Sequence, residues 1–152
     1  MESGARLDLG EAAAARLVLE GALGNPLDPA SLVPGDGARL RIAFSQAAGE
    51  TVHREWTPAE FAEGAAVDYR ARGGFWEKAT FERLEQFGSI AHCWSVFESI
   101  EGDATNAPFA RGINSIQLVQ TDEGWRIAHL LWDIEQAHNP IPSDYAGGAA
   151  AP

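Results

Sequence analysis

Three side chains that can transfer protons fall within two nearby stretches of this sequence. His92 lies in "SIAHCWSVFESI" (residues 89–100), and His129 and Asp133 lie in "WRIAHLLWDIE" (residues 125–135). An imidazole titrates near neutral pH and suits proton transfer, and a positioned carboxyl group can serve as an acid or a base. These three residues are therefore the candidates for general acid/base catalysis.

The elements that must position these groups follow from the residue pattern. Alternation and β-forming residues predict strands at 38–46, 75–87, 89–100, 109–120 and 125–135. Helices are predicted at 11–20, just after Asp28, and after Thr57, where Thr57 and Glu60 form a capping box. Helices followed by antiparallel strands indicate an α+β fold.

The register of the last strands follows from charge and turn chemistry. Gly124 in "TDEGW" predicts a three-residue hairpin loop with a bulge, and a Glu98–Arg111 pair aligns the preceding strand. The predicted cross-strand pairs are Thr121 with Trp125, Gln117 with His129, Ile113 with Asp133, His92 with Gln117, and Trp94 with Ser115.

This register divides the sheet into two chemically different faces. We call one the polar-aromatic face; it is predicted to carry His92, Trp94, Glu98, Arg111, Ser115, Gln117, Trp125, His129 and Asp133. We call the other the apolar face; it is predicted to carry Ala91, Cys93, Ser95, Phe97, Asn114, Ile116, Leu118, Ala128, Leu130 and Trp132.

Tryptophans among hydrogen-bonding groups are typical of a subunit interface. The polar-aromatic face is therefore predicted to join a homodimer through His92, Trp94, Ser115, Gln117, Trp125 and His129. Under that interpretation the histidines are structural. A slip of one residue in the last two strands would instead move His129 to the other face, where catalysis becomes the better interpretation.

On the apolar face, Ser95 and Asn114 fall opposite each other. A buried amide without a partner costs about 1–3 kcal/mol, so Asn114 needs one. Ser95, a backbone group, an ordered water or a ligand could supply it.

Composition excludes several classes of function. The chain has 152 residues, of which 45% are hydrophobic and 22% charged, as in an ordinary single domain (1–152). A formal net charge of −11 argues against nucleic-acid partners and anionic membranes. No signal-peptide pattern or membrane-spanning run is present, so a cytoplasmic location is expected. Metal-ligand spacings and phosphate-binding loops are also missing, so no metal and no cofactor are expected.

The order of these elements resembles the nuclear transport factor 2-like superfamily. Within it, residues 73–99 and 110–133 resemble the SnoaL-like branch of small bacterial proteins. The resemblance covers about residues 8–136, which leaves 139–152 as a flexible tail. It implies a cone-shaped α+β barrel, in which a strongly bent antiparallel sheet wraps around N-terminal helices. It also implies an apolar cavity at the open end and a homodimer.

The resemblance does not imply one chemistry, because the superfamily holds isomerases, cyclases, dehydratases, epoxide hydrolases and non-catalytic binding modules. The predicted function is a small-molecule-binding domain for a small hydrophobic ligand. The residues expected around the cavity are Trp56, Phe61, Tyr69, Phe75, Cys93, Ser95, Asn114 and Trp132. The alternative is a cofactor-independent isomerase, cyclase or dehydratase that uses His92, His129 or Asp133.

Overall fold

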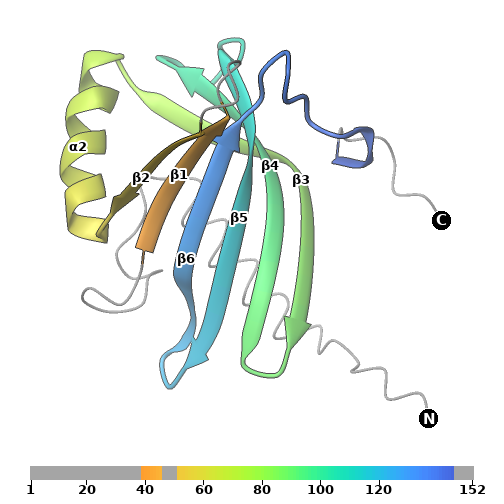
Figure 1. Ribbon diagram of the computed structural model, residues 1–152. Coiled ribbons are helices and arrows are strands. Elements are labelled where there is room, and N and C mark those ends of the chain that lie inside the picture. The colour runs from red at the N-terminus through yellow and green to blue at the C-terminus, as the bar shows by residue number, and fades with distance from the viewer. Residues whose placement is uncertain (1–38, 46–50, 146–152) are drawn as a thin grey trace.

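A six-stranded sheet forms the body of the chain in the computed structural model, which describes residues 39–45 and 51–145 (Figure 1). The predicted helices at 11–20 and after Asp28 lie outside the described residues. In chain order the elements are β1 (Arg39–Ser45), β2 (Thr51–Trp56), α2 (Pro58–Ala71), β3 (Phe75–Phe87), β4 (Ile90–Glu101), β5 (Ala110–Thr121), β6 (Gly124–Ile134) and the short 3-10 helix η3 (Ser143–Tyr145).

The strand order is β2-β1-β6-β5-β4-β3, and the pairing is antiparallel except between β1 and β6, which run parallel. The predicted α+β class is therefore confirmed, and the sheet is mostly antiparallel, with one parallel pair of strands. Strand β2 was not predicted from the sequence. Its sequence "TVHREW" has consecutive charged and polar residues that are exposed, and so lacks the alternation that marks a half-buried strand.

Helix α2 begins as its sequence predicts. The Thr57 hydroxyl accepts a hydrogen bond from the Glu60 backbone N–H, and the Glu60 carboxylate accepts one from the Thr57 backbone N–H at 2.8 Å. Pro58 fits the first turn because no intrahelical partner exists there for a backbone N–H. The helix stops before Gly73, whose φ of 72° suits glycine. No helix within the described ranges is long and apolar enough to cross a membrane.

The hairpin between β5 and β6 contains a bulge, so part of β6 presents its side chains to a different face from the one predicted. Gln117 pairs with His129 and Ile113 with Asp133, as predicted, but Leu118 pairs with Ile127. Ala128 is thus an extra residue that forms a β-bulge, and beyond a bulge the side chains change faces.

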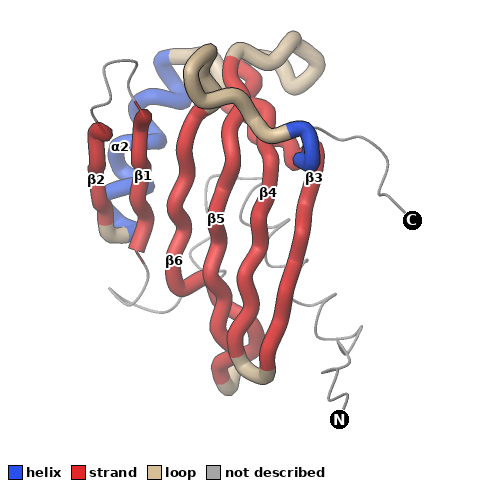
Figure 2. Tube along the Cα trace, turned by 45° about the vertical axis from the view of Figure 1, so that its right-hand side comes forward, coloured by secondary structure: helices blue, strands red, loops and turns tan. Residues whose placement is uncertain are grey.

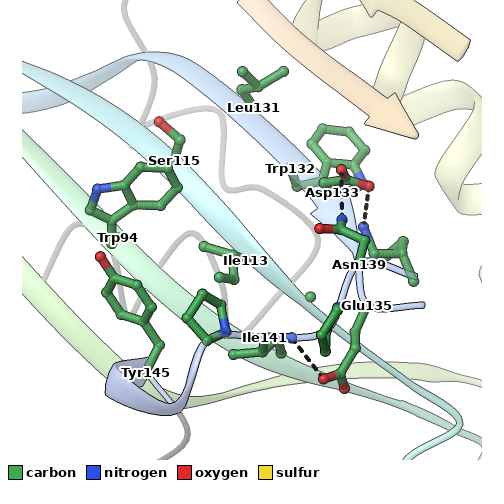
Figure 3. A pocket seen from close by; sticks show the side chains of 14 residues that line it. Trp94, Ile113, Ser115, Leu131, Trp132, Asp133, Glu135, Asn139, Ile141 and Tyr145 are labelled. Atoms are coloured by element: carbon green, nitrogen blue, oxygen red, sulfur yellow. Dashed lines mark hydrogen bonds between the residues drawn. The ribbon is translucent and has the colours of Figure 1, made fainter. Parts of the chain in front are cut away.

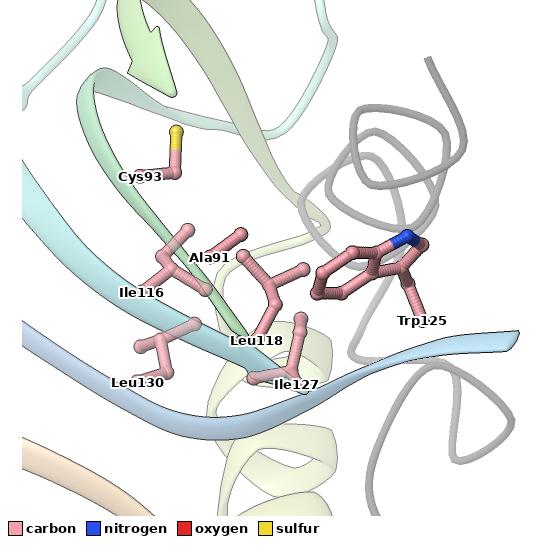
Figure 4. Packing of buried hydrophobic residues seen from close by; sticks show 7 residues of the cluster. All are labelled: Ala91, Cys93, Ile116, Leu118, Trp125, Ile127 and Leu130. Atoms are coloured by element: carbon pink, nitrogen blue, oxygen red, sulfur yellow. The ribbon is translucent and has the colours of Figure 1, made fainter. Parts of the chain in front are cut away.

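Trp125 is the residue most affected by this bulge. It pairs with Gln120 rather than Thr121, and it is only 3% exposed within the core cluster (Figure 4). Its placement on the polar-aromatic face, and with it an interface role there, was wrong. The core cluster on the apolar face consists of Ala91, Cys93, Ile116, Leu118, Trp125, Ile127 and Leu130.

The two sheet faces have different covers. Helix α2 lies behind the sheet beside β1 and β2, whereas the segment after β6 crosses in front of it (Figure 2). Residues 139–145 were predicted to belong to a flexible tail. Instead, Ile141 donates its backbone N–H to Glu135 at 2.9 Å, and the Tyr145 ring packs against Phe81. No local pattern predicts the packing of Tyr145, because its partner is distant along the chain.

Candidate functional site

A carboxyl–amide pair lies within the apolar face of the sheet. Asn114 Nδ2 on β5 donates a hydrogen bond to Glu77 Oε1 on β3 at 2.8 Å. Strand β4 lies between β3 and β5, so both side chains must reach across it. Asn114 is only 2% exposed. The partner that a buried Asn114 requires is therefore Glu77.

Burial makes the Glu77 carboxyl a weaker acid by raising its pKa. Loss of solvation raises the pKa of the Glu77 carboxyl from 4.5 to about 7, and the hydrogen bond from Asn114 opposes that rise in pKa. Burial has this effect because an apolar surrounding disfavours the ionised form. Near neutral pH, Glu77 therefore exists in both protonation states and can either give or take a proton.

Ser95 adds a third polar group to this face. It is fully buried, and its Oγ has no hydrogen-bond partner among the described residues. Ser95, Asn114 and Trp132 pair in one row across β4, β5 and β6. Buried polar groups are nearly always hydrogen-bonded, so the Ser95 hydroxyl, which lies opposite Asn114, is suited to binding a ligand.

Three aromatic rings from three elements meet at the Trp132 end of this row. Trp132 and Trp56 are stacked with their ring centroids 5.9 Å apart, and Phe61 meets both rings edge-on at 5.9 and 5.7 Å. Phe61 comes from the first turn of α2, so the capped start of that helix sets the position of its ring. The result is a cluster of aromatic rings at the end of the row.

The other three predicted cavity residues are Cys93, Phe75 and Tyr69. Cys93 is fully buried in the core cluster. Phe75 packs against Phe109 with ring centroids 6.3 Å apart, and is not part of the Trp56–Phe61–Trp132 group. The side chain of Tyr69 lies outside what the structure describes. The structure thus brings together Trp56, Phe61, Ser95, Asn114 and Trp132.

The predicted acid/base residues belong to the polar-aromatic face. His92 Nε2 lies 2.9 Å from Ser115 Oγ, and His92 and His129 flank Gln117 in one row. Asp133 accepts hydrogen bonds from the Ile134 backbone and from Asn139 Nδ2. These groups are separated by the sheet from the Glu77–Asn114 pair. No metal-binding cluster of three or more histidine, cysteine or acidic residues occurs in the part of the chain that the structure describes.

Glu77 was not predicted from the sequence, although a signal was present. In "FWEKATF", Glu77 shares a strand face with Phe75 and Ala79 by the period of two. One acid between two apolar neighbours on such a face is a candidate buried carboxyl. Its hydrogen bond to Asn114 could not be predicted, because it joins residues 37 positions apart on strands that are not neighbours.

Comparison with solved structures identifies the fold. No protein-family model and no curated protein matches the sequence. Among solved structures, a domain of unknown function with a cystatin-like fold from Nostoc punctiforme is 16% identical with a TM-score of 0.58. The match covers 85% of this chain and 80% of that one.

Two further structures carry the superfamily's description. An NTF2-like protein of unknown function from Methylobacillus flagellatus is 12% identical with a TM-score of 0.54, over 86% of this chain and 97% of that one. A proposed dehydratase of the NTF2-like family from Streptomyces avermitilis is 14% identical with a TM-score of 0.52, over the same shares. At these identities the likeness concerns the fold, and it shows that this chain adopts the fold of the nuclear transport factor 2-like superfamily.

Proposed function

We propose that this protein binds a small apolar molecule carrying one or two oxygen atoms on the apolar face of its sheet. The observation that carries the proposal is a group of polar side chains on this face, namely the buried Ser95 and Asn114 and the half-buried Glu77 carboxyl that is bonded to Asn114. Small-ligand sites combine mostly apolar walls with a few polar groups that fix orientation. The Trp56–Phe61–Trp132 cluster supplies part of the apolar wall in this proposal.

The shape of the site belongs to the same proposal. The upper ends of β3 and β4 bend behind the sheet toward α2 (Figure 1). A sheet bent in this way, wrapped around helices into a cone, would enclose the Glu77–Asn114 pair between its walls. Enclosure matters chemically, because hydrogen bonds to a ligand gain strength when water is excluded.

The proposal predicts what happens when Asn114 is replaced by leucine. The protein should be purified from cells, extracted with organic solvent, and its bound small molecules identified by mass spectrometry. Asn114→Leu should remove the oxygen-containing ligand that the unchanged protein retains, because the amide donor is lost. It should also raise the pKa of Glu77 above about 7, since the hydrogen bond that lowers it is gone.

The matched control is Glu85→Gln, which changes an exposed carboxyl on β3 and should leave the bound molecule in place. If Asn114→Leu and unchanged protein retain the same molecule equally, Asn114 only satisfies Glu77 within the core. If unchanged protein yields no small molecule, and its melting temperature does not rise with any of a set of apolar ketones and alcohols, the binding proposal is refuted.

A second candidate function is cofactor-independent proton transfer, and Glu77 favours it. A carboxyl group with a pKa of about 7 can remove a proton from one position of a substrate and return it at another, or assist the loss of water. Asn114 would hold the carboxyl in place. The likeness to a proposed dehydratase is compatible with this reaction class. Under this proposal the acid/base group is Glu77, in place of His92, His129 or Asp133.

We also propose that the chain forms a homodimer through the uncovered part of the polar-aromatic face. Gln117 is exposed there between the part-buried His92 and His129, and the apolar residues Phe87 and Ile90 on the same face are 74% and 59% exposed. Exposed apolar groups beside a polar row suit a protein interface. Membership of the SnoaL-like branch and a cytoplasmic location stay predictions from the sequence.

Light scattering tests the homodimer. The unchanged chain should have the mass of two copies at micromolar concentration, and Ile90→Lys should reduce it to one by placing a charge in the interface. Val67→Lys is the matched control: Val67 is 69% exposed on α2, so this variant should remain dimeric. A monomeric unchanged chain refutes the proposal.

A further inference from the structure

A separate pocket opens on the polar-aromatic face, on the side of the sheet away from the Glu77–Asn114 pair. Its volume is about 450 Å³, within the range of small-ligand sites. Ile113 and Leu131 form its floor, and residues 139–145 form one wall (Figure 3). The lining includes Trp132, which was predicted for the cavity, and Asp133, which was predicted for acid/base chemistry, but the pocket itself was not predicted.

The wall formed by residues 139–145 is fixed at several points. Asn139 Nδ2 donates to Asp133 at 3.3 Å, and the Ile141 backbone N–H donates to Glu135 at 2.9 Å. At the far end, Arg83 donates to the Tyr145 hydroxyl at 3.0 Å. Pro140 and Pro142 further restrict the backbone between these points. The pocket is therefore preformed, and a ligand need not order this segment on binding.

Two aromatic rings line one side of the pocket. Trp94 and Tyr145 are tilted against each other with ring centroids 6.4 Å apart. The Trp94 ring is held edge-on by His92 at 5.3 Å, and the Tyr145 ring by Phe81 at 5.4 Å. Arg83 also lies over the Tyr145 ring, at 5.2 Å from its centroid. Rings held in this way offer a rigid surface to another flat ring.

The opposite side of the pocket is polar. Asp133 and Asn139 lie there, across the floor from Trp94 and Tyr145 (Figure 3). The Glu135 carboxylate, which also lines the pocket, pairs with Arg111 at 3.3 Å. Two carboxylates in the lining, in a chain of net charge −11, disfavour an anionic ligand. A carboxylate and an amide oxygen can both accept a hydrogen bond from a neutral hydroxyl or N–H group.

We propose that this pocket is a second binding site, for an uncharged planar aromatic molecule with a hydroxyl or N–H group at one edge. The ring lies over Ile113 and Leu131 against Trp94 and Tyr145, and its polar edge faces Asp133 and Asn139. This assignment is independent of the function proposed for the apolar face. Trp94 and Ser115 were predicted to lie in the dimer interface, and this proposal assigns them to the pocket instead. The row of His92, Gln117 and His129 stays assigned to the interface.

Titration with 2-naphthol tests the site. Binding is measured by calorimetry and by the shift of the Trp94 indole N–H signal in nuclear magnetic resonance spectra. The Trp94→Phe variant identifies that signal by its loss. Leu131→Trp should fill the pocket and weaken binding at least about tenfold, a loss of about 1.4 kcal/mol. Val67→Trp adds the same side chain on exposed helix surface and should bind as the unchanged protein does. Asn114→Leu should also bind normally, because it alters only the other face.

Two results would overturn the assignment. If Asn114→Leu abolishes naphthol binding while Leu131→Trp does not, the probe occupies the apolar face and the second site does not exist. If binding is lost in Ile90→Lys in step with a change from two copies to one, the pocket exists only between two copies of the chain and is no site of a single subunit. A Trp94 signal that does not move on saturation also overturns it.

Discussion

Replacing Glu77 with glutamine should stabilise the protein at pH 8 by up to about 3 kcal/mol while leaving its stability at pH 4 nearly unchanged. The folded state raises the pKa of Glu77 from 4.5 to about 7. Below pH 4.5 the carboxyl is protonated in both states. As the pH rises from 4.5 to about 7, the unfolded chain loses the proton first, so the free energy of unfolding falls, and the loss is complete above pH 7.

Glutamine removes this dependence, because it stays neutral and can still accept the hydrogen bond from Asn114. Urea unfolding of both proteins between pH 4 and 8 measures the difference directly. Glu85→Gln is the control on the same strand, where the exposed carboxyl has no burial cost to relieve. Equal pH dependence in Glu77→Gln and in unchanged protein would mean that Glu77 is solvated in the folded state.

The same variant separates the two candidate functions of the apolar face. If the protein only binds its ligand, Glu77→Gln should retain the extracted small molecule. If Glu77 transfers a proton, the variant should still bind, but the molecule extracted from it should be the unconverted substrate, whereas unchanged protein should also yield the product. Comparing the molecules extracted from the two proteins therefore distinguishes binding from catalysis even when the substrate has not been identified.

Replacing Gly112 with alanine should destabilise the protein by about 2–3 kcal/mol, the cost of overfilling a close-packed site. Gly112 lies in β5 between Phe97 of β4 and Ile134 of β6. An added Cβ would overlap the Asp133 carbonyl oxygen and lie 2.5 Å from Phe97 Cζ. Because the carbonyl belongs to the sheet backbone, it cannot move aside without breaking strand pairing.

Gly64→Ala is the matched control, since the same methyl group is added in a different setting. Gly64 lies within α2, and nothing lies within 4 Å of the position its Cβ would take. Alanine should there stabilise the protein by about 1 kcal/mol, because glycine loses more backbone entropy in a helix. Thermal unfolding of both variants gives opposite shifts in melting temperature if the close packing at Gly112 is real, and shifts of the same sign if it is not.

The local elements could be predicted from the sequence because their signals are local. The Thr57–Glu60 capping box, Pro58 and Gly73 delimit α2 within four residues of chain at each end, and each acts on its own turn. The period of two located β3 to β6 for the same reason. Placing Glu98 opposite Arg111 gave the observed alignment of β4 with β5, although the ion pair of Arg111 in the structure is with Glu135.

Only the tertiary structure decided where these strands depart from regularity and which groups meet. The bulge at Ala128 places the Trp125 side chain in the core. No residue type in "WRIAH" predicts a bulge at this position. The parallel pairing of β1 with β6, the packing of Tyr145 against Phe81 and the Glu77–Asn114 hydrogen bond all join distant parts of the chain. Their energies arise from burial and from contacts that exist only after the chain has folded. The sequence therefore determined α2, β1 and β3 to β6 and the faces of most of their residues, whereas packing determined the face of Trp125 and the groups that meet in the site.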